Sequence, residues 1–160
     1  GYHVEGKNLA IEITESTIVQ ETEAVTTTIA VLREAGIQIY IDDFGTGYSS
    51  LSYLHSLPFD VLKIDRSFIH QMHTTDNSTG IEIVQTIVSL SKELKKTVIA
   101  EGVETKQELE TLRKLGCYYF QGFYVSEPVN STDAARFLEQ EIGPRIPEPF
   151  QSLNHRLGGE

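Results

Sequence analysis

Five short apolar runs divide the chain, and segments with apolar residues at helical spacing lie between them. The runs are nearly continuous rather than alternating, which is typical of strands buried on both faces of a parallel sheet. Strands are predicted at residues 9–13, 37–41, 61–64, 97–100 and 118–120. Helices are predicted at residues 21–35, 50–57, 81–95, 105–116 and 132–141. A strand followed by a helix, five times over, predicts an α/β fold in which helices cover a parallel sheet.

Individual residues mark where two of these helices end and where one begins. Gly36 and Gly116 each follow a helical pattern, at the position where a left-handed residue commonly ends a helix. Thr105 and Glu108 have the spacing of a capping box, which predicts a helix start there. The polar stretch 73–80 precedes the next predicted helix, which is expected to begin at about Ile81.

Polar side chains lie at or near the carboxyl end of each predicted strand. These strand-end residues are Glu12, Asp42, Lys63, Glu101 and Gln121. Because the carboxyl ends of parallel strands meet at one edge of a sheet, we expect the five side chains to face a common site.

Asp42 and Asp43 directly follow an apolar run. Adjacent carboxylates repel each other unless a cation or several hydrogen-bond donors lie between them. The pair alone leaves two interpretations open, a divalent metal site or one helix cap beside a solvated acid. The other strand-end residues favour the metal, because Mg²⁺ and Mn²⁺ prefer carboxylate oxygens.

Composition narrows the class of protein. The chain has 160 residues, of which 39% are hydrophobic and 22% charged, which suits one globular domain, or a large piece of one, with a substantial core. Its net charge of −10, from 13 basic and 23 acidic residues, disfavours a surface that binds duplex nucleic acid. An anionic ligand is still compatible with this charge, because a bound metal reverses the local sign of a pocket.

Features of membrane or exported proteins are missing from the sequence. No uncharged apolar run reaches the roughly 18 residues that a membrane helix needs. The first residues lack the pattern of a signal peptide. The single cysteine, Cys117, cannot form an internal disulfide, which fits a reducing compartment. We therefore expect a cytoplasmic protein whose chain makes no contact with a membrane.

Five segments resemble motifs of the EAL family, the cyclic di-GMP-specific phosphodiesterases. Residues 11–16 are similar to the family's E-x-T-E-S motif, and residues 42–51 resemble its D-D-F-G-x-G-x-S-S-L motif. Residues 63–65, 101–104 and 121–123 match K-x-D, E-G-V-E and Q-G-Y/F in the same order along the chain. The resemblance covers nearly the whole chain.

The resemblance implies a modified (β/α)8 barrel of the TIM type. Residues 1–143 would supply its C-terminal portion, about five strand–helix units that correspond to strands four to eight. Residues 144–160 are expected to form an irregular tail, since they contain three prolines near its start. The family's Glu-Ala-Leu motif does not occur in the 160 residues. We therefore expect a homodimer, or association with the missing part of the barrel, to complete the fold.

The resemblance also implies a site for Mg²⁺ or Mn²⁺, with two metals in the complete domain. The implied metal ligands are Glu12, Asp42, Asp43 and Glu101. Glu12 and Asp42 would bind the first metal, while Asp42 would also reach the second beside Asp43 and Glu101. Two such ions about 3.5–4 Å apart supply a nucleophilic water and stabilise the leaving oxygen in phosphodiester hydrolysis.

The implied catalytic residues are Glu101, as general base, and Lys63, which would orient the water or offset developing negative charge. For Lys63, a structural salt bridge to Asp65 or Glu101 is the alternative. The remaining implied roles are contacts to the substrate by Gln121, Glu104 and Asp65, and anchoring of the loop at residues 45–50 by Glu15.

The implied function is hydrolysis of cyclic di-GMP to linear pGpG in bacterial second-messenger signalling. A receptor that binds cyclic di-GMP without cutting it, and an inactive fragment, are the alternatives. Residues 43–45 also mimic the magnesium motif of protein kinases, but the other kinase motifs are missing, so a kinase is rejected. His70 and His73 are not interpreted as a metal site, and residues 118–120 are interpreted as strand core.

Overall fold

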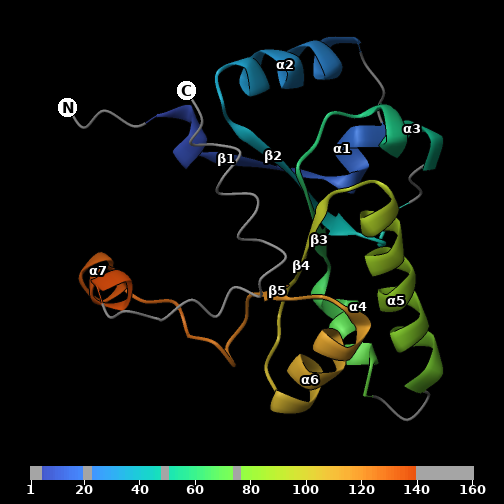
Figure 1. The fold of residues 1–160 in the computed structure, drawn as a ribbon, viewed down its shortest axis with the longest axis vertical. Coiled ribbons are helices and arrows are strands. Elements are labelled where there is room, and N and C mark those ends of the chain that lie inside the picture. The colour runs from blue at the N-terminus through green and yellow to red at the C-terminus, as the bar shows by residue number, and fades with distance from the viewer. Residues whose placement is uncertain (1–4, 20–22, 48–50, 74–76, 140–160) are drawn as a thin grey trace. The chain divides into compact units, whose positions relative to one another are not determined.

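The structure is a computed structural model, and it describes residues 5–19, 23–47, 51–73 and 77–139. Five parallel strands form one sheet in the order β1-β2-β3-β4-β5 (Figure 1). They are β1 (Ala10–Thr14), β2 (Gln38–Phe44), β3 (Val61–Ile64), β4 (Thr97–Ala100) and β5 (Tyr119–Phe120). The predicted parallel α/β sheet is confirmed, and its sequential strand order is the order of a (β/α) barrel.

Helices connect the strands. They are the 3₁₀ helix η1 (Gly6–Asn8) and the α-helices α1 (Glu15–Val19), α2 (Glu23–Glu34), α3 (Leu51–Ser56), α4 (Arg66–Gln71), α5 (Asn77–Glu93), α6 (Lys106–Leu115) and α7 (Ser131–Glu139). Five of these correspond to the predicted helices, whereas η1, α1 and α4 were not predicted. No helix of the described residues is long and apolar enough to cross a membrane.

The chain forms two compact units, residues 1–125 and 126–160. The first unit contains the whole sheet, and α7 belongs to the second. The tail predicted for residues 144–160 lies outside the described residues, so its irregular form stays a prediction.

The predicted helix boundaries at glycine and at the capping box are confirmed. Gly36 and Gly116 have φ values of 82° and 87°, in the left-handed region that ends a helix without steric cost for glycine. In the capping box of α6, the Glu108 amide donates to the Thr105 hydroxyl oxygen, and the Glu108 carboxylate accepts from the Thr105 amide.

Helix α5 begins at Asn77, four residues before the start predicted at about Ile81. Gly80 explains the difference. It is buried, and a Cβ at this position would lie 2.6 Å from the backbone carbonyl carbon of Gln71. The glycine therefore lets α5 pack closely on the end of α4, and it is a packing position rather than a helix breaker.

Two strand predictions also need correction. Strand β2 continues through Asp42 and Asp43 to Phe44, so both acids lie within the strand rather than after it. Strand β5 starts at Tyr119, and Tyr118 before it is exposed, so Tyr118 is not part of the core. Strand β5 is an edge strand of the described sheet, where it pairs with β4.

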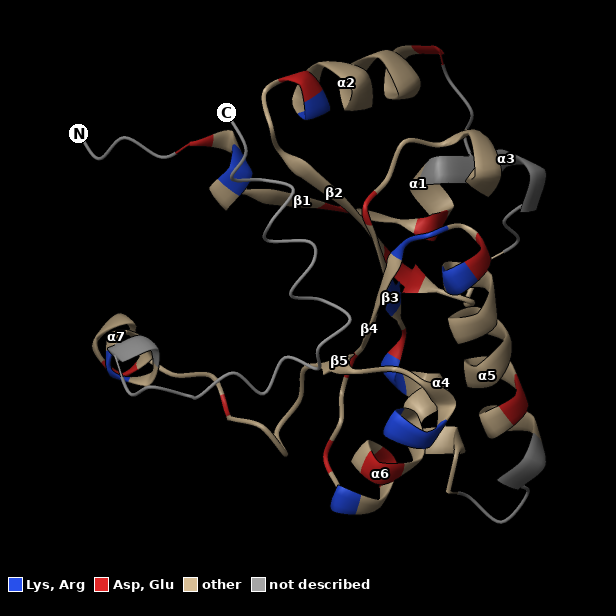
Figure 2. Cartoon of the chain, in the orientation of Figure 1, with Lys and Arg blue, Asp and Glu red and all other residues tan. Residues whose placement is uncertain are grey.

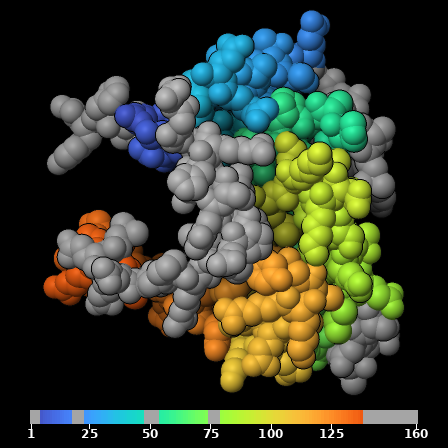
Figure 3. Space-filling model, viewed as in Figure 1, coloured from blue at the N-terminus to red at the C-terminus, as the bar shows by residue number. Residues whose placement is uncertain are grey.

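The core lies between the sheet and the helices. Strand β3 is buried along its whole length, and α5 packs against β3, β4 and α6. Figure 3 shows α5 and α6 side by side on the outer surface. The largest fully buried side chains are Phe59, Ile39, Ile41, Leu54, Leu62, Ile64, Ile69, Met72, Leu112, Val84 and Val88. This packing fixes the positions of β2, β3 and β4, and so of the polar residues at their carboxyl ends.

Candidate metal centre

Lys63 lies at the centre of a group of carboxylates. Its Nζ atom is 2.7 Å from Glu12 Oε1, 2.7 Å from Glu101 Oε1 and 3.1 Å from Asp42 Oδ1. These partners come from three other strand units, and the Lys63 side chain is only 4% exposed. Charged residues accordingly gather along the middle of the sheet in Figure 2. Gln121 Nε2 donates to Glu101 Oε1 at 2.8 Å, so the structure brings all five strand-end residues together.

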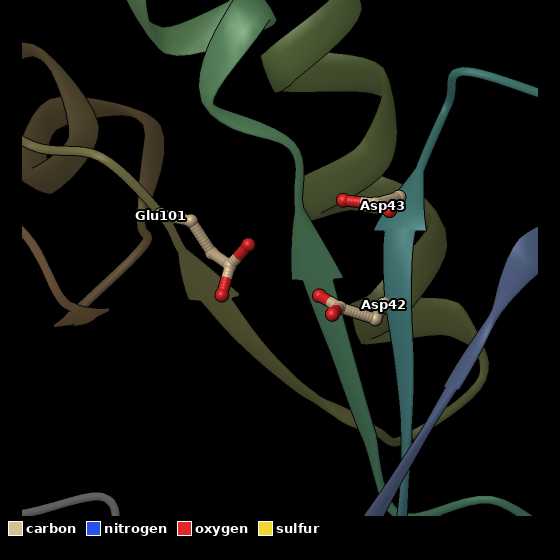
Figure 4. Close-up of side chains that lie close together, drawn as sticks. All are labelled: Asp42, Asp43 and Glu101. Carbon is tan, nitrogen blue, oxygen red and sulfur yellow. The ribbon is translucent and has the colours of Figure 1, made fainter.

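Asp43 reaches the same place through an irregular backbone. In a regular strand, neighbouring side chains point to opposite faces. Here the pairing of β2 with β3 shifts register between Ile41 and Phe44, and Asp43 has a φ of 53°. Figure 4 shows the Asp42 and Asp43 side chains extending from β2 on the side that faces Glu101. Such a left-handed residue costs about 1–3 kcal/mol, and such costs cluster at functional sites.

The electrostatics of the carboxylate cluster (Glu12, Asp42, Asp43 and Glu101) are unbalanced. Burial and the neighbouring charges of Asp42 and Asp65 raise the pKa of Asp43. Burial also raises the pKa of Glu101, although Lys63 opposes this shift. Four carboxylates and one ammonium group give the ionised cluster a net charge of −3.

The cluster fits a divalent cation. Oxygen atoms of Asp42, Asp43 and Glu101 lie within 4.8 Å of one another. Asp42 Oδ1 is buried and, among the described residues, accepts no hydrogen bond of good geometry, although Lys63 Nζ lies 3.1 Å away. Carboxylate oxygens are the ligands that Mg²⁺, Mn²⁺ and Ca²⁺ prefer. A cation here would satisfy the buried oxygen and offset the excess negative charge.

Lys63 stays charged in this setting. Burial alone would lower the pKa of its ammonium group, but the contacts with Glu101, Glu12 and Asp42 outweigh burial and raise the pKa above its ordinary value. An ion pair with Asp65, considered from the sequence, is not among the ion pairs of the described residues, whereas the pair with Glu101 is present.

Glu15 lies beneath the segment that follows β2. Its carboxylate is 3% exposed, and its Oε2 accepts hydrogen bonds from the amides of Gly45 at 2.8 Å and Gly47 at 3.1 Å. A Cβ at Gly47 would lie 3.1 Å from the Glu15 carboxyl carbon, so glycine gives this carboxylate its close approach. The predicted loop at residues 45–50 is described only as far as Gly47.

The three predicted substrate contacts differ in their surroundings. Gln121 bonds Glu101, as described above. Asp65 caps α4, since its Oδ1 accepts from the Ser67 amide at 3.0 Å and from the Ser67 hydroxyl. Glu104 is exposed, and its Oε1 lies 4.0 Å from His70 Nε2, away from the ion pairs of Lys63.

Comparison with known protein families identifies the fold. A model of the EAL domain matches residues 2–128 of the chain. The chain belongs to the EAL domain family. The EAL domain thus accounts for the parallel sheet, and the five strand–helix units are part of its (β/α)8 barrel.

Named relatives of this EAL domain include enzymes. The cyclic di-GMP phosphodiesterase NbdA of Pseudomonas aeruginosa is 41% identical over 146 residues, which are 91% of this chain and 18% of that protein. The chain spans about a fifth of the length of the curated relatives it matches.

Solved EAL structures contain both ligand and metal. The chain matches the MucR phosphodiesterase of P. aeruginosa in complex with c-di-GMP at 42% identity, with a TM-score of 0.75, over 82% of this chain and 52% of that one. It matches BlrP1 of Klebsiella pneumoniae at 36% identity, with a TM-score of 0.69, over 76% of this chain and 30% of that one. BlrP1 was solved as complexes of cyclic di-GMP with manganese and with calcium.

Proposed function

We propose that this EAL domain hydrolyses cyclic di-GMP to linear pGpG with divalent metals, in bacterial second-messenger signalling in the cytoplasm. The observation that carries the proposal is the buried Lys63 among the carboxylates of Glu12, Asp42 and Glu101, with Asp43 turned to the same side. The names of NbdA and of the MucR complex support the choice of substrate.

The carboxylate cluster would hold Mg²⁺ or Mn²⁺. Following the family resemblance, Glu12 and Asp42 would bind one metal, and Asp42, Asp43 and Glu101 would bind the second. Bound ions of this kind lower the pKa of water and neutralise charge on the phosphoryl oxygens.

Glu101 is the proposed general base. In the reaction, a water oxygen bonds to phosphorus, the bond from phosphorus to the 3′ oxygen breaks, and that oxygen takes up a proton. The contacts of Glu101 with Lys63 and Gln121 both use Oε1, which leaves Oε2 to accept the proton of the water.

Lys63 is the second proposed catalytic residue. Its raised pKa keeps the ammonium group charged, so it offsets negative charge that develops on the phosphoryl group. Because three carboxylates fix its position from neighbouring strands, this charge needs little reorganisation during the reaction.

Substrate contacts are proposed for Gln121, Glu104 and Asp65. Gln121 uses its amide nitrogen on Glu101 and keeps a carbonyl oxygen to accept from a guanine N–H. The Asp65 carboxylate, which contacts Ser67 and Asp43, would accept from a guanine N–H. Glu104 is exposed three residues after Glu101, and Glu15 would hold the loop next to the bound ligand.

The proposed domain needs further barrel strands, from a homodimer or from association with the rest of the barrel. Strands β1 and β5 each pair with one neighbour in the described sheet, and open edges favour pairing with another strand. An apolar groove of about 320 Å³ lies beside β1. Its lining includes Ile11, Ile13, Val25, Leu32 and Ile39, which suits an added strand and its helix.

One assay tests the proposed function. Cyclic di-GMP is incubated with the domain and Mn²⁺ or Mg²⁺, while binding is followed by calorimetry and pGpG by chromatography. We expect binding and product, with loss of product when the metal is chelated. Binding without product selects a receptor function, and no binding at all contradicts both the hydrolase and the receptor function.

Asp43→Asn provides the matched variant for this assay, because it removes one charge from the cluster and keeps the size of the side chain. We expect it to weaken Mn²⁺ binding and to remove most of the product. Glu110→Gln, an exposed change on α6, is the control and should behave like the parent protein.

A further inference from the structure

Glu108 is a buried charge that the proposed reaction does not use. It lies in the first turn of α6 and is only 5% exposed. Burying a carboxylate is costly unless hydrogen bonds and opposite charge surround it. The partners of Glu108 therefore indicate what this charge holds in place.

The partners of Glu108 lie in the segment that joins β4 to α6, which begins at Glu101. One carboxylate oxygen, Oε2, accepts from the amides of Glu104 and Thr105, each at 2.8 Å. The hydrogen bonds to these amides lower the pKa of Glu108 despite its burial. A single oxygen thus fixes two consecutive peptide groups at one end of the segment.

The other end of this segment is fixed at the carboxylate cluster. The Glu101 amide donates to Ile64 O at 3.1 Å, and the Val103 amide donates to Gln121 O at 3.1 Å. The Glu101 side chain bonds Gln121 and Lys63. Both anchor points lie within the five consecutive residues 101–105, so a shift at the Glu108 end would move the peptide groups that orient Glu101 and Gln121.

His70 ties the same carboxylate to a second strand unit. The other oxygen of Glu108, Oε1, lies 3.5 Å from His70 Nδ1, and Glu104 Oε1 lies 4.0 Å from His70 Nε2. His70 lies on α4, which directly follows the strand that carries Lys63. Glu108 therefore contacts both the segment after Glu101 and the helix after Lys63.

We propose that Glu108 is a positioning residue of the metal centre, which sets the path of residues 101–105 and so the placement of Glu101 and Gln121. This inference rests on the proposed function. It differs from the ordinary role of a capping-box glutamate, which would stabilise α6 and leave the carboxylate cluster unaffected.

Four variants separate the two roles. Glu108→Ala removes both hydrogen bonds to the segment, whereas Thr105→Ala removes the other half of the same capping box and leaves those bonds in place. Glu108→Gln keeps an oxygen that can accept both bonds. Glu108→Asp keeps the charge but is one methylene too short to keep the geometry.

The measurements are Mn²⁺ affinity, by calorimetry, and the hydrogen exchange of the amides of residues 103–105 without metal, by NMR. We expect Glu108→Ala and Glu108→Asp to weaken Mn²⁺ binding by roughly tenfold or more and to speed amide exchange, as loss of outer contacts to a metal site does. Thr105→Ala and Glu108→Gln should keep both quantities close to those of the parent.

Two results would overturn the inference. Equal losses in Thr105→Ala and Glu108→Ala would reduce Glu108 to a helix cap, and unchanged affinity in Glu108→Asp would remove its link to the metal centre. If Glu108→Ala does not fold, the Mn²⁺ affinities of Glu108→Asp and Glu108→Gln distinguish the two roles instead. A parent protein that binds no Mn²⁺ would contradict the proposed function alone, while the exchange measurement still tests the positioning role.

Discussion

At the scale of single residues, the burial of Lys63 depends on its acidic partners. A buried ammonium group is stable here because carboxylates from Glu12, Asp42 and Glu101 surround it. The dependence is mutual, since the same ammonium group is the only described cation in ion-pair contact with the cluster. Replacing Lys63 with a neutral residue therefore leaves the repulsion among the carboxylates of the cluster uncompensated.

Lys63→Met is expected to destabilise the metal-free protein by about 3 kcal/mol, because it leaves partly buried carboxylates without their cation. Mn²⁺ should recover part of this loss, since a ligand that binds only the folded state stabilises it. Urea denaturation with and without Mn²⁺ measures both effects. Lys114→Met, on the exposed face of α6, is the control. Equal stability of Lys63→Met and the parent without metal would contradict the account.

Glu101→Gln is expected to keep most of the affinity for cyclic di-GMP and to lower turnover by a factor of about 100 or more, because the amide cannot take a proton from water. Calorimetry and initial rates on the complete domain measure the two quantities separately. Unchanged turnover in this variant would rule out the base role of Glu101.

The sequence predicts which residues meet at the carboxyl ends of the strands, because chain order and strand direction determine that edge. It does not predict how Asp43 reaches the cluster. The left-handed φ of 53° and the register shift between Ile41 and Phe44 depend on pairing with β3. Nor did the sequence assign Glu108 to the site, although its capping-box spacing was recognised.

At the scale of secondary-structure elements, the sequence correctly predicted the helix boundaries that depend on neighbouring residues in the chain. The capping box of α6 and the glycines at helix ends appear where the sequence places them. The start of α5 did not follow from local signals, because the role of Gly80 depends on the approach of Gln71 from α4. The short helix α4 was missed because its apolar residues are too few to show a helical period.

The capping box gives α6 a pH-dependent stability. The pKa of Glu108 is lowered in the folded protein from its ordinary value of 4.5. Its carboxylate therefore stabilises the fold at pH values above 4.5, and this stabilisation is lost as the pH falls through the folded pKa. We expect Glu108→Gln to be less stable than the parent by about 1 kcal/mol at pH 7, because a charged carboxylate accepts stronger hydrogen bonds than an amide oxygen. The difference should disappear in strongly acidic solution. Urea denaturation across this range tests the sign, and a difference that grows with acidity would contradict it.

At the scale of the whole molecule, the described sheet has two open edges, β1 and β5, and the carboxylate cluster extends from the edge strand β1 to the end of β4. This chain covers 52% of the MucR chain that it matches. A substrate bound by this cluster would therefore contact only one side of the barrel in these 160 residues.

We expect the 160-residue chain, verified as a monomer, to hydrolyse cyclic di-GMP far more slowly than a complete EAL domain, because strands beyond β1 and β5 would supply further contacts to metal and substrate. Rates for the chain and for the complete domain, at equal Mn²⁺, provide the comparison. Full turnover by the verified monomer would show that the described sheet is sufficient.

The central claim is that Asp42, Asp43 and Glu101 form a divalent metal site. An NMR titration with Mn²⁺ tests it directly, since the paramagnetic ion broadens the signals of nearby amides. We predict that the amides of these three residues broaden at the lowest Mn²⁺ concentrations, and that Asp43→Asn shifts the effect to higher concentrations. Broadening that begins at exposed acids such as Glu93 and Glu110, or that is uniform along the chain, would contradict the claim.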